Sequence, residues 1–190
     1  MRSRTQEERI LTGGHLGRVF GHSEQISIPK RGREWATASC GDFAQGVFKP
    51  FLDVTPQDVR ETLEVNVTTA FTFARESILD FKKNDIADGK RGTIIFTGAT
   101  AALRGNVMTS VFAAGKHGQR ALSQSLAKEF GKDNIHVAHT IIDGQILTDR
   151  TRSYNDGASN WATNADVRLS PESIASAYLY LVNQDRSAWT

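Results

Sequence analysis

The sequence predicts an α/β fold in which parallel strands form one sheet and helices cover both of its faces. Two observations support this prediction. Short runs rich in β-branched residues, at 93–97 and 135–142, alternate with two long segments of helical periodicity, at 56–83 and 110–130. The order helix, strand, helix, strand, loop, helix also requires crossover connections, which are right-handed and join parallel strands.

Length and composition predict one domain. The chain has 190 residues, of which 39% are hydrophobic and 23% charged, enough for one sizeable core and too few for two. No run approaches the roughly 20 apolar residues that a spanning helix needs, so we expect no membrane insertion. The formal net charge of +2 is too small to indicate nucleic-acid binding.

Cysteine usage and the N-terminal residues bear on the compartment. Cys40 is the only cysteine, which excludes an internal disulfide and a cysteine-rich metal site. The first ten residues contain arginines and glutamates and no apolar core, so they do not match a secretory signal. We therefore expect a cytoplasmic protein.

Residues 1–45 are expected to be an irregular N-terminal segment. The residues from Thr12 to Gly17, TGGHLG, predict a surface turn, with a pyrophosphate-binding glycine turn as the alternative, because the residues before them are polar. The following QISIPKRGREW is basic and interrupted by Pro29 and Gly32, which predicts a loop. Its cations are expected to be solvated, with a nucleotide-phosphate contact as the alternative: Lys30, Arg31 and Arg33.

The first long helix is expected over residues 56–83. Thr55 is a favourable N-cap, and Pro56 suits the first helical position because its missing N–H is not needed there. Asn66 lies within the apolar stripe of this helix and therefore needs buried hydrogen-bond partners. The stripe itself recurs at three- and four-residue steps: Val59, Leu63, Val67, Ala70, Phe71, Ala74, Ile78 and Leu79.

The stretch from Thr93 to Lys116 is where function is first sought. Its strand ends in small residues and is followed by the helix at 110–130, which places a crevice at the carboxyl end of the strand. Open α/β sheets bind their ligands in such crevices. The helix has an apolar face of small residues that allows another helix to approach closely, and Gly131 is its expected C-cap.

The last third of the chain contains one strand, one loop and one helix. Residues 135–142 are almost continuously apolar, which predicts a strand buried on both faces. His136 and His139 are three residues apart on this strand, so they point to opposite sides and cannot share a metal ion. Residues 147–169 are polar and rich in turns, as in a mobile lid. Ser170 is the expected N-cap of a helix that continues to Leu181.

Four motifs in a fixed order resemble those of the short-chain dehydrogenase/reductase family. LEVNV resembles the helix with the catalytic Asn, at Asn66, and FAAGK resembles the Tyr-x-x-x-Lys motif, with Lys116 in place. TIIFTGA resembles the strand that ends at the catalytic Ser, and DGQILT resembles the turn that grips the nicotinamide carboxamide. The resemblance covers Val47 to Thr190, about three quarters of the chain.

The resemblance implies a Rossmann-like three-layer sandwich with a mostly parallel sheet. The sheet would be incomplete in its N-terminal half and would lack the last strand, and the dehydrogenase-like domain would span residues 46–190. The family moves a hydride between NAD(P) and a carbonyl or alcohol, which implies NAD or NADP as the cofactor. By resemblance the cofactor would contact Asn66, Gly98, Lys116, Ile146 and Thr148.

The chain departs from the family at the residues that move protons. Phe112 stands at the catalytic Tyr position and Ala99 at the Ser position, and neither side chain can donate a hydrogen bond. General acid catalysis typically contributes about 10² to 10⁴ in rate, so we expect the usual mechanism to lose that factor. Asp143 replaces the family's proline, and Asp42-Phe43-Ala44 stands at its Asn-Ala-Gly position. Five nearby groups are candidate replacements: Thr97, Thr100, Thr109, Ser110 and His117.

Two functions follow from this resemblance. The first is an NAD(P)-dependent oxidoreductase with an atypical site, acting on a small carbonyl or alcohol, as in a biosynthetic pathway. The alternative is a relative without redox chemistry, either an isomerase or cyclase or an inactive dimerising pseudoenzyme. The family's helices equivalent to 56–83 and 110–130 commonly pack into a four-helix dimer contact, which implies a homo-oligomer through these two helices.

Overall fold

The structure is a computed structural model, and it describes residues 27–28, 35–38, 48–155 and 160–190. The predicted order of helix, strand, helix, strand, loop and helix is confirmed from residue 56 onward, with the short helix α4 inside the predicted loop. The elements are β1 (Ser27–Ile28), β2 (Trp35–Ala38), α1 (Pro56–Leu63), α2 (Thr69–Phe81), β3 (Gly92–Ala99), α3 (Ser110–Phe130), β4 (Ile135–Ile142), α4 (Asp149–Tyr154) and α5 (Pro171–Asn183).

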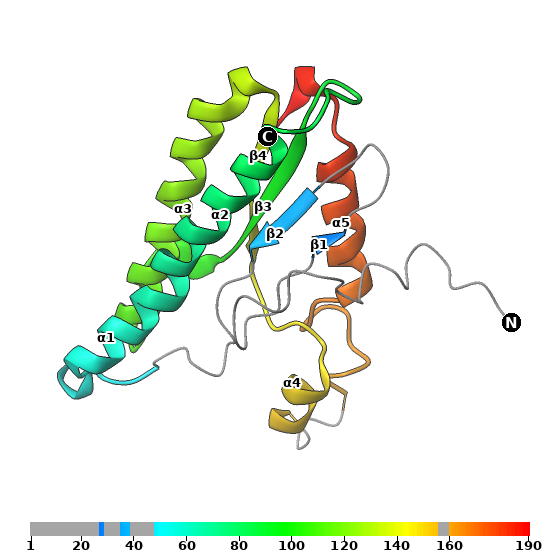
Figure 1. The fold of residues 1–190 in the computed structure, drawn as a ribbon. Coiled ribbons are helices and arrows are strands. Elements are labelled where there is room, and N and C mark those ends of the chain that lie inside the picture. Colours follow the sequence, from blue (N-terminus) through cyan, green and yellow to red (C-terminus); the bar gives the residue numbers. More distant parts are fainter. Residues whose placement is uncertain (1–26, 29–34, 39–47, 156–159) are drawn as a thin grey trace, which may run out of the picture.

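One sheet lies between two layers of helices, which confirms the predicted three-layer α/β sandwich. The strand order is β1-β2-β3-β4. β2, β3 and β4 are parallel, and only β1 runs antiparallel to its neighbour. α1, α2 and α3 lie on one side of the sheet and α5 lies on the other (Figure 1).

The alternating side chains of β3 build a core on each face of the sheet. Ile94 and Phe96 pack under α2 and α3, where they join a cluster with Phe73, Ile78 and Leu122. Ile95 points to the other face and packs against Val182 of α5. β4 is buried in its first half only, from Ile135 to Ala138, so the expectation of burial along the whole strand is only partly met.

The prediction of a loop for QISIPKRGREW is wrong at both ends of that segment. Ser27–Ile28 and Trp35–Ala38 are strands, and β2 pairs with β3 from Trp35–Thr93 to Ala38–Phe96. A strand of four residues is too short to show a clear alternation, so its pairing with β3 decides its conformation. The glycine turn at 12–17, the cations at Lys30, Arg31 and Arg33, and residues 42–44 lie outside the described residues.

The long helix at 56–83 is confirmed, but a π-helical segment at 64–68 separates α1 from α2. A π-turn holds an extra residue and so rotates the faces before and after it relative to each other. The predicted buried stripe is therefore wrong in part, because Val59, Leu63, Phe71 and Leu79 are exposed. Phe73 and Phe81, which the stripe omitted, are buried. Phe71 and Leu79 instead border a groove between α2 and α3.

The end of α3 falls at Phe130 and Gly131 is its C-cap, both as predicted, although Gly131 is not in the left-handed conformation common at such caps. Gly131 has a φ of −57° and begins a 3-10 turn, and the left-handed residue is Asn134, with a φ of 61°. The segment 147–169, expected as a lid, contains α4 and is tied at its base by a bridge between Ile146 and Leu169.

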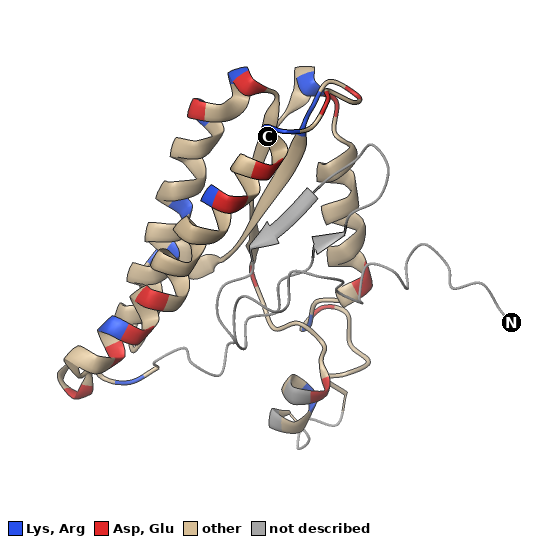
Figure 2. Cartoon of the chain, viewed as in Figure 1, with Lys and Arg blue, Asp and Glu red and all other residues tan. Residues whose placement is uncertain are grey.

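Charged side chains of both signs occur on α1, α2 and α3, whereas α5 carries a single acidic residue, Glu172 (Figure 2). This mixture is typical of a solvated surface. Within the described ranges, no helix has the length and apolar character required to cross a membrane.

Candidate functional site

The carboxyl ends of β3 and β4 lie side by side at the edge of the sheet where the sequence predicts a crevice. Gly98 pairs with Ile141 and Ala99 with Ile142. The loops that follow the two strands meet there, because the Thr100 hydroxyl donates a hydrogen bond to Oδ1 of Asp143. Asp143, which replaces the family's proline, thus faces the hydroxyl next to Ala99.

Asn66 lies in the π-helical segment and is buried against α3. Only 5% of its surface is exposed. Its Nδ2 donates to the Thr62 carbonyl over 3.0 Å, while its Oδ1 is buried without a hydrogen-bond partner among the described residues. A Cβ on Gly115 would lie 3.1 Å from Cβ of Asn66. The glycine therefore lets α3 approach Asn66 one residue before Lys116.

Lys116 places a buried ammonium group next to β3. It is 6% exposed, and Nζ lies 3.2 Å from the Thr97 carbonyl and 3.4 Å from Oε1 of Gln119. Nζ also lies 5.9 Å from the centre of the Phe112 ring, within reach of a cation–π contact. Asn66 and Lys116 are about 50 residues apart in the sequence. The fold places Asn66 beside the turn of α3 that carries Lys116.

Ala99 and Phe112, the residues predicted at the family's Ser and Tyr positions, form an apolar wall. Phe112 is buried in a cluster with Ala101 and Ala113, and Ala99 packs against it. On its other side Phe112 contacts Phe48, with 5.4 Å between ring centres. Because these side chains have no hydrogen-bonding atoms, this wall is apolar and cannot donate a proton.

The candidate replacement groups differ in what they already bind. The Thr97 hydroxyl lies 2.7 Å from the Tyr178 hydroxyl of α5, and the Thr109 hydroxyl donates to the Asn106 carbonyl over 2.9 Å. His117 is exposed, with Nδ1 2.9 Å from the Ala113 carbonyl, and Ser110 is exposed. Thr100 is the candidate that contacts a carboxylate at the carboxyl end of β3.

Gly98 and His139 fit each other closely. A Cβ on Gly98 would lie 2.4 Å from Cε1 and 2.5 Å from Nε2 of the His139 ring. Burial, together with the charges of Arg120 and Lys116, lowers the pKa of His139 to about 4. Burial also lowers the pKa of His136, whose ring stacks on Trp189. Both imidazoles are therefore neutral near pH 7, and they lie on opposite faces of β4 as predicted.

Ile146 and Thr148 have local structural contacts. Ile146 pairs with Leu169, and the Thr148 hydroxyl caps α4 by accepting a hydrogen bond from the Thr151 N–H over 3.1 Å. The sequence analysis did not identify Gln119, Tyr178 or His139 as neighbours of the site. Each is a polar residue within an apolar helix or strand, and that pattern was the signal that pointed to Asn66.

A search of the described segments for three or more neighbouring His, Cys, Asp or Glu side chains that could hold a metal ion found none.

A family model described as short chain dehydrogenase matches residues 41–159 of the chain. This match covers more than half of the sequence. The chain therefore belongs to the short-chain dehydrogenase/reductase family.

Related sequences match about two thirds of the chain. Carbonyl reductase family member 4 of Xenopus laevis is 26% identical over 126 residues, which are 66% of this chain and 51% of that protein. The 3-oxoacyl-(acyl-carrier-protein) reductase FabG of Vibrio cholerae is 30% identical over 129 residues, 66% of this chain and 50% of FabG. The chain thus spans about half the length of the curated relatives it matches.

Solved structures show the same fold. A short-chain dehydrogenase from Rhodopseudomonas palustris is 33% identical with a TM-score of 0.61, covering 83% of this chain and 58% of that one. A 4-hydroxyisoleucine dehydrogenase complexed with NADH is 25% identical with a TM-score of 0.62, covering 79% of this chain and 61% of that one. These neighbours agree with the Rossmann-like sandwich that the sequence resemblance implied.

Proposed function

We propose that the protein is an NAD(P)-dependent oxidoreductase with an atypical site, acting on a small carbonyl or alcohol. The observation that carries the cofactor site in this proposal is the placement of Lys116 and Asn66 beside the same turn of α3, next to the carboxyl end of β3. The Oδ1 of Asn66 is buried without a hydrogen-bond partner among the described residues, and such burial is unfavourable, so its placement here favours a polar ligand. The reductases and dehydrogenases among its relatives agree with this chemistry.

The residues of this site fit a nicotinamide dinucleotide. The Asn66 Oδ1, buried and without a partner among the described residues, can accept a hydrogen bond from a bound water or hydroxyl. Lys116 Nζ, which lies 3.2 Å from the Thr97 carbonyl and 3.4 Å from Oε1 of Gln119, would hold a ribose hydroxyl as the lysine of the family does. Gly98, Ile146 and Thr148 would border the nicotinamide. When bound, the cofactor would supply or accept the hydride.

Thr100 is the group that we assign to the substrate oxygen. It follows Ala99 directly, and its hydroxyl is oriented by Asp143. The single O–H of Thr100 is donated to Asp143, so its lone pairs can accept a hydrogen bond from a substrate alcohol, and a carbonyl oxygen would receive this O–H only in place of Asp143. Phe112 leaves the site without the family's proton donor, and the substrate oxygen would therefore exchange its proton with water.

Isothermal titration calorimetry of the full chain with NADH and NADPH tests the proposal. We expect one of them to bind, and we expect Lys116→Met to weaken binding by about tenfold, corresponding to about 1.4 kcal/mol for a lost charged hydrogen bond. Lys128→Met, an exposed lysine on the same helix, is the matched control and should leave the affinity unchanged. Failure of both nucleotides to bind at millimolar concentration would refute the oxidoreductase assignment.

The second candidate function is a non-redox relative or a dimerising pseudoenzyme. The apolar packing of Ala99 and Phe112 favours it, since the positions of both missing hydroxyls are filled by the protein's own side chains. Asn66 and Lys116 do not discriminate between the two functions, because a relative that lost activity recently would retain them. Binding of NAD(P)H does discriminate.

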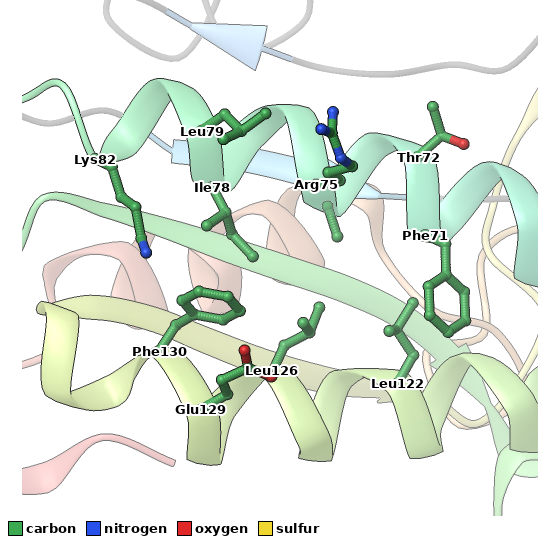
Figure 3. Close-up of a pocket in the computed structure, with 11 residues that line it drawn as sticks. Phe71, Thr72, Arg75, Ile78, Leu79, Lys82, Leu122, Leu126, Glu129 and Phe130 are labelled. Atoms are coloured by element: carbon green, nitrogen blue, oxygen red, sulfur yellow. The ribbon is translucent and has the colours of Figure 1, made fainter.

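We also propose a homodimer through the long helices under either function. An apolar groove with a volume of about 470 Å³ runs between α2 and α3. Leu122, Leu126 and Phe130 of α3 point toward Phe71 and Ile78 of α2 (Figure 3). Arg75, Lys82 and Glu129 border the same groove, so two copies related by a two-fold axis would present opposite charges to each other.

Sedimentation velocity tests the dimer. Phe71 is 54% exposed in the groove, and Phe71→Glu should shift the protein to the monomer because it would bury a charge in the contact. Tyr180→Glu, at a 65% exposed position on α5, is the control that should remain dimeric. A wild-type chain that sediments as a monomer at tens of micromolar would contradict the proposal.

A further inference from the structure

Exposed apolar side chains gather in two short segments that a backbone hydrogen bond joins, one of which follows the carboxyl end of β3. Thirteen large hydrophobic side chains of the described residues are exposed, and six of them come from two short segments, 48–52 and 103–108. Two of the six are almost fully exposed, Leu52 at 92% and Val107 at 83%. We call the six residues the apolar collar: Phe48, Phe51, Leu52, Leu103, Val107 and Met108.

The two segments of the collar are joined to each other and to the site. The Lys49 N–H donates to the Met108 carbonyl over 3.1 Å. Lys49 Nζ also forms a 2.7 Å ion pair with Asp58 in the first turn of α1. Phe48 packs on Phe112, which stands at the position of the family's Tyr. The apolar surface therefore continues from Ala99 and Phe112 outward to the collar.

The backbone holds Val107 and Met108 outward in a specific turn. Asn106 Oδ1 accepts from the Val107 N–H over 2.8 Å, and the Thr109 hydroxyl accepts from the Asn106 N–H over 2.9 Å. Met108 has a φ of 64°, a conformation that costs a residue other than glycine free energy. A strained turn that exposes two apolar side chains to water is unfavourable in the free chain, and a bound apolar ligand would offset that cost.

We infer that the collar binds the hydrocarbon chain of the substrate, so that the substrate is an alkyl carbonyl or alcohol with an extended apolar tail. This inference rests on the proposed function, since it places the substrate oxygen at Thr100. A tail starting there meets Ala99 and Phe112 first and reaches the collar next. The continuity of this surface with the crevice favours a substrate tail over a second copy of the chain, whose proposed contact is the groove between α2 and α3.

The test is calorimetry with unreactive straight-chain primary amides, from butanamide to decanamide, titrated into the full chain with and without NADPH or NADH. Each added methylene should tighten the dissociation constant by about threefold to fourfold, as expected for a buried CH₂ group. Val107→Ser and Phe51→Ser should weaken decanamide binding by about tenfold and leave butanamide binding unchanged. Ile86→Ser is the matched control, because Ile86 is 50% exposed but precedes β3 at its opposite end.

The outcomes separate this inference from the proposed function. Amide affinities that do not change with chain length, in a protein that binds NAD(P)H, would overturn the inference alone. An equal loss of affinity in Ile86→Ser would also overturn it, because the effect would not be specific to the collar. If Val107→Ser changes the sedimenting mass and not the amide affinity, a second copy covers the collar and the inference is wrong. Length-dependent amide binding without NAD(P)H binding would support the collar and refute the oxidoreductase.

Discussion

At the scale of single residues, the clearest constraint at the site is steric. Gly98 ends the buried part of β3, and the ring of His139 occupies the space where its side chain would be. The neighbouring strand thereby determines which residue position 98 can hold. The glycine near the end of β3 thus leaves space for one half-buried imidazole.

We expect Gly98→Ala to lower the free energy of unfolding by about 1 to 3 kcal/mol, the usual cost of overpacking a core. The added Cβ would lie about 2.4 Å from the His139 ring, so the ring has to move. Urea unfolding measures the loss. The double variant Gly98→Ala with His139→Ala should show strong coupling, because the alanine removes the ring that causes the clash. Additive losses would contradict this explanation.

Restoring the two missing hydroxyls tests the interpretation of the site. Ala99→Ser combined with Phe112→Tyr should raise the rate of carbonyl reduction by about 10² to 10⁴, the usual contribution of general acid catalysis. NAD(P)H oxidation with a panel of aldehydes and ketones measures the rate. Adding Lys116→Met should remove the gain. An unchanged rate in a double variant that still binds the cofactor would show that the missing hydroxyls do not limit activity.

At the scale of elements, α5 is anchored by a lysine outside the site. Lys90 lies in the turn before β3 and is buried, and its Nζ donates to the carbonyls of Val182 and Gln184 over 2.7 and 2.9 Å. These are carbonyls at the C-terminal end of α5, which have no partners within the helix. Lys90 thus binds the helix on one face of the sheet to the start of β3.

Lys90→Met should lower the free energy of unfolding by about 1.5 to 3 kcal/mol, because it leaves two buried carbonyls without their charged donor. Limited proteolysis should then cut near residues 184–190 faster than in the wild type. Lys83→Met is the control, since Lys83 forms an exposed ion pair with Asp80, and such pairs contribute little. Equal effects of the two substitutions would argue against the anchor.

At the scale of the whole molecule, two histidines make stability depend on pH. His139 is neutral in the fold because its pKa is lowered from 6.5 to about 4, and the pKa of His136 is lowered as well. The unfolded chain therefore binds more protons than the folded chain between these pH values. The stabilisation by the neutral imidazoles is complete above pH 6.5 and is lost as the pH falls toward 4.

We expect the urea midpoint to fall steadily from pH 7 to pH 4.5. His139→Gln should make this dependence shallower, because a neutral side chain cannot take up the proton, whereas His117→Gln, at an exposed histidine, should not. The hydrogen bond with Lys49 lowers the pKa of Asp58 from 3.8 to about 2. Asp58 therefore loses its contribution to stability only below pH 3.8, outside the range from pH 7 to pH 4.5. A slope that is the same in both variants would contradict the assignment to His139.

The sequence by itself determined the α/β class, the bounds of α3 and the positions of Asn66, Ala99, Phe112 and Lys116 in the family motifs, because helical periodicity and β-branched runs are local signals. Tertiary structure decided what no local pattern carries. Pairing with β3 made Trp35–Ala38 a strand, the π-turn changed which side of 56–83 is buried, and side-chain contacts joined His139 to Gly98 and Thr100 to Asp143. These features depend on contacts between residues that are distant in the chain, or on which face of a long helix turns toward the sheet. Only the packing of the folded chain decides them.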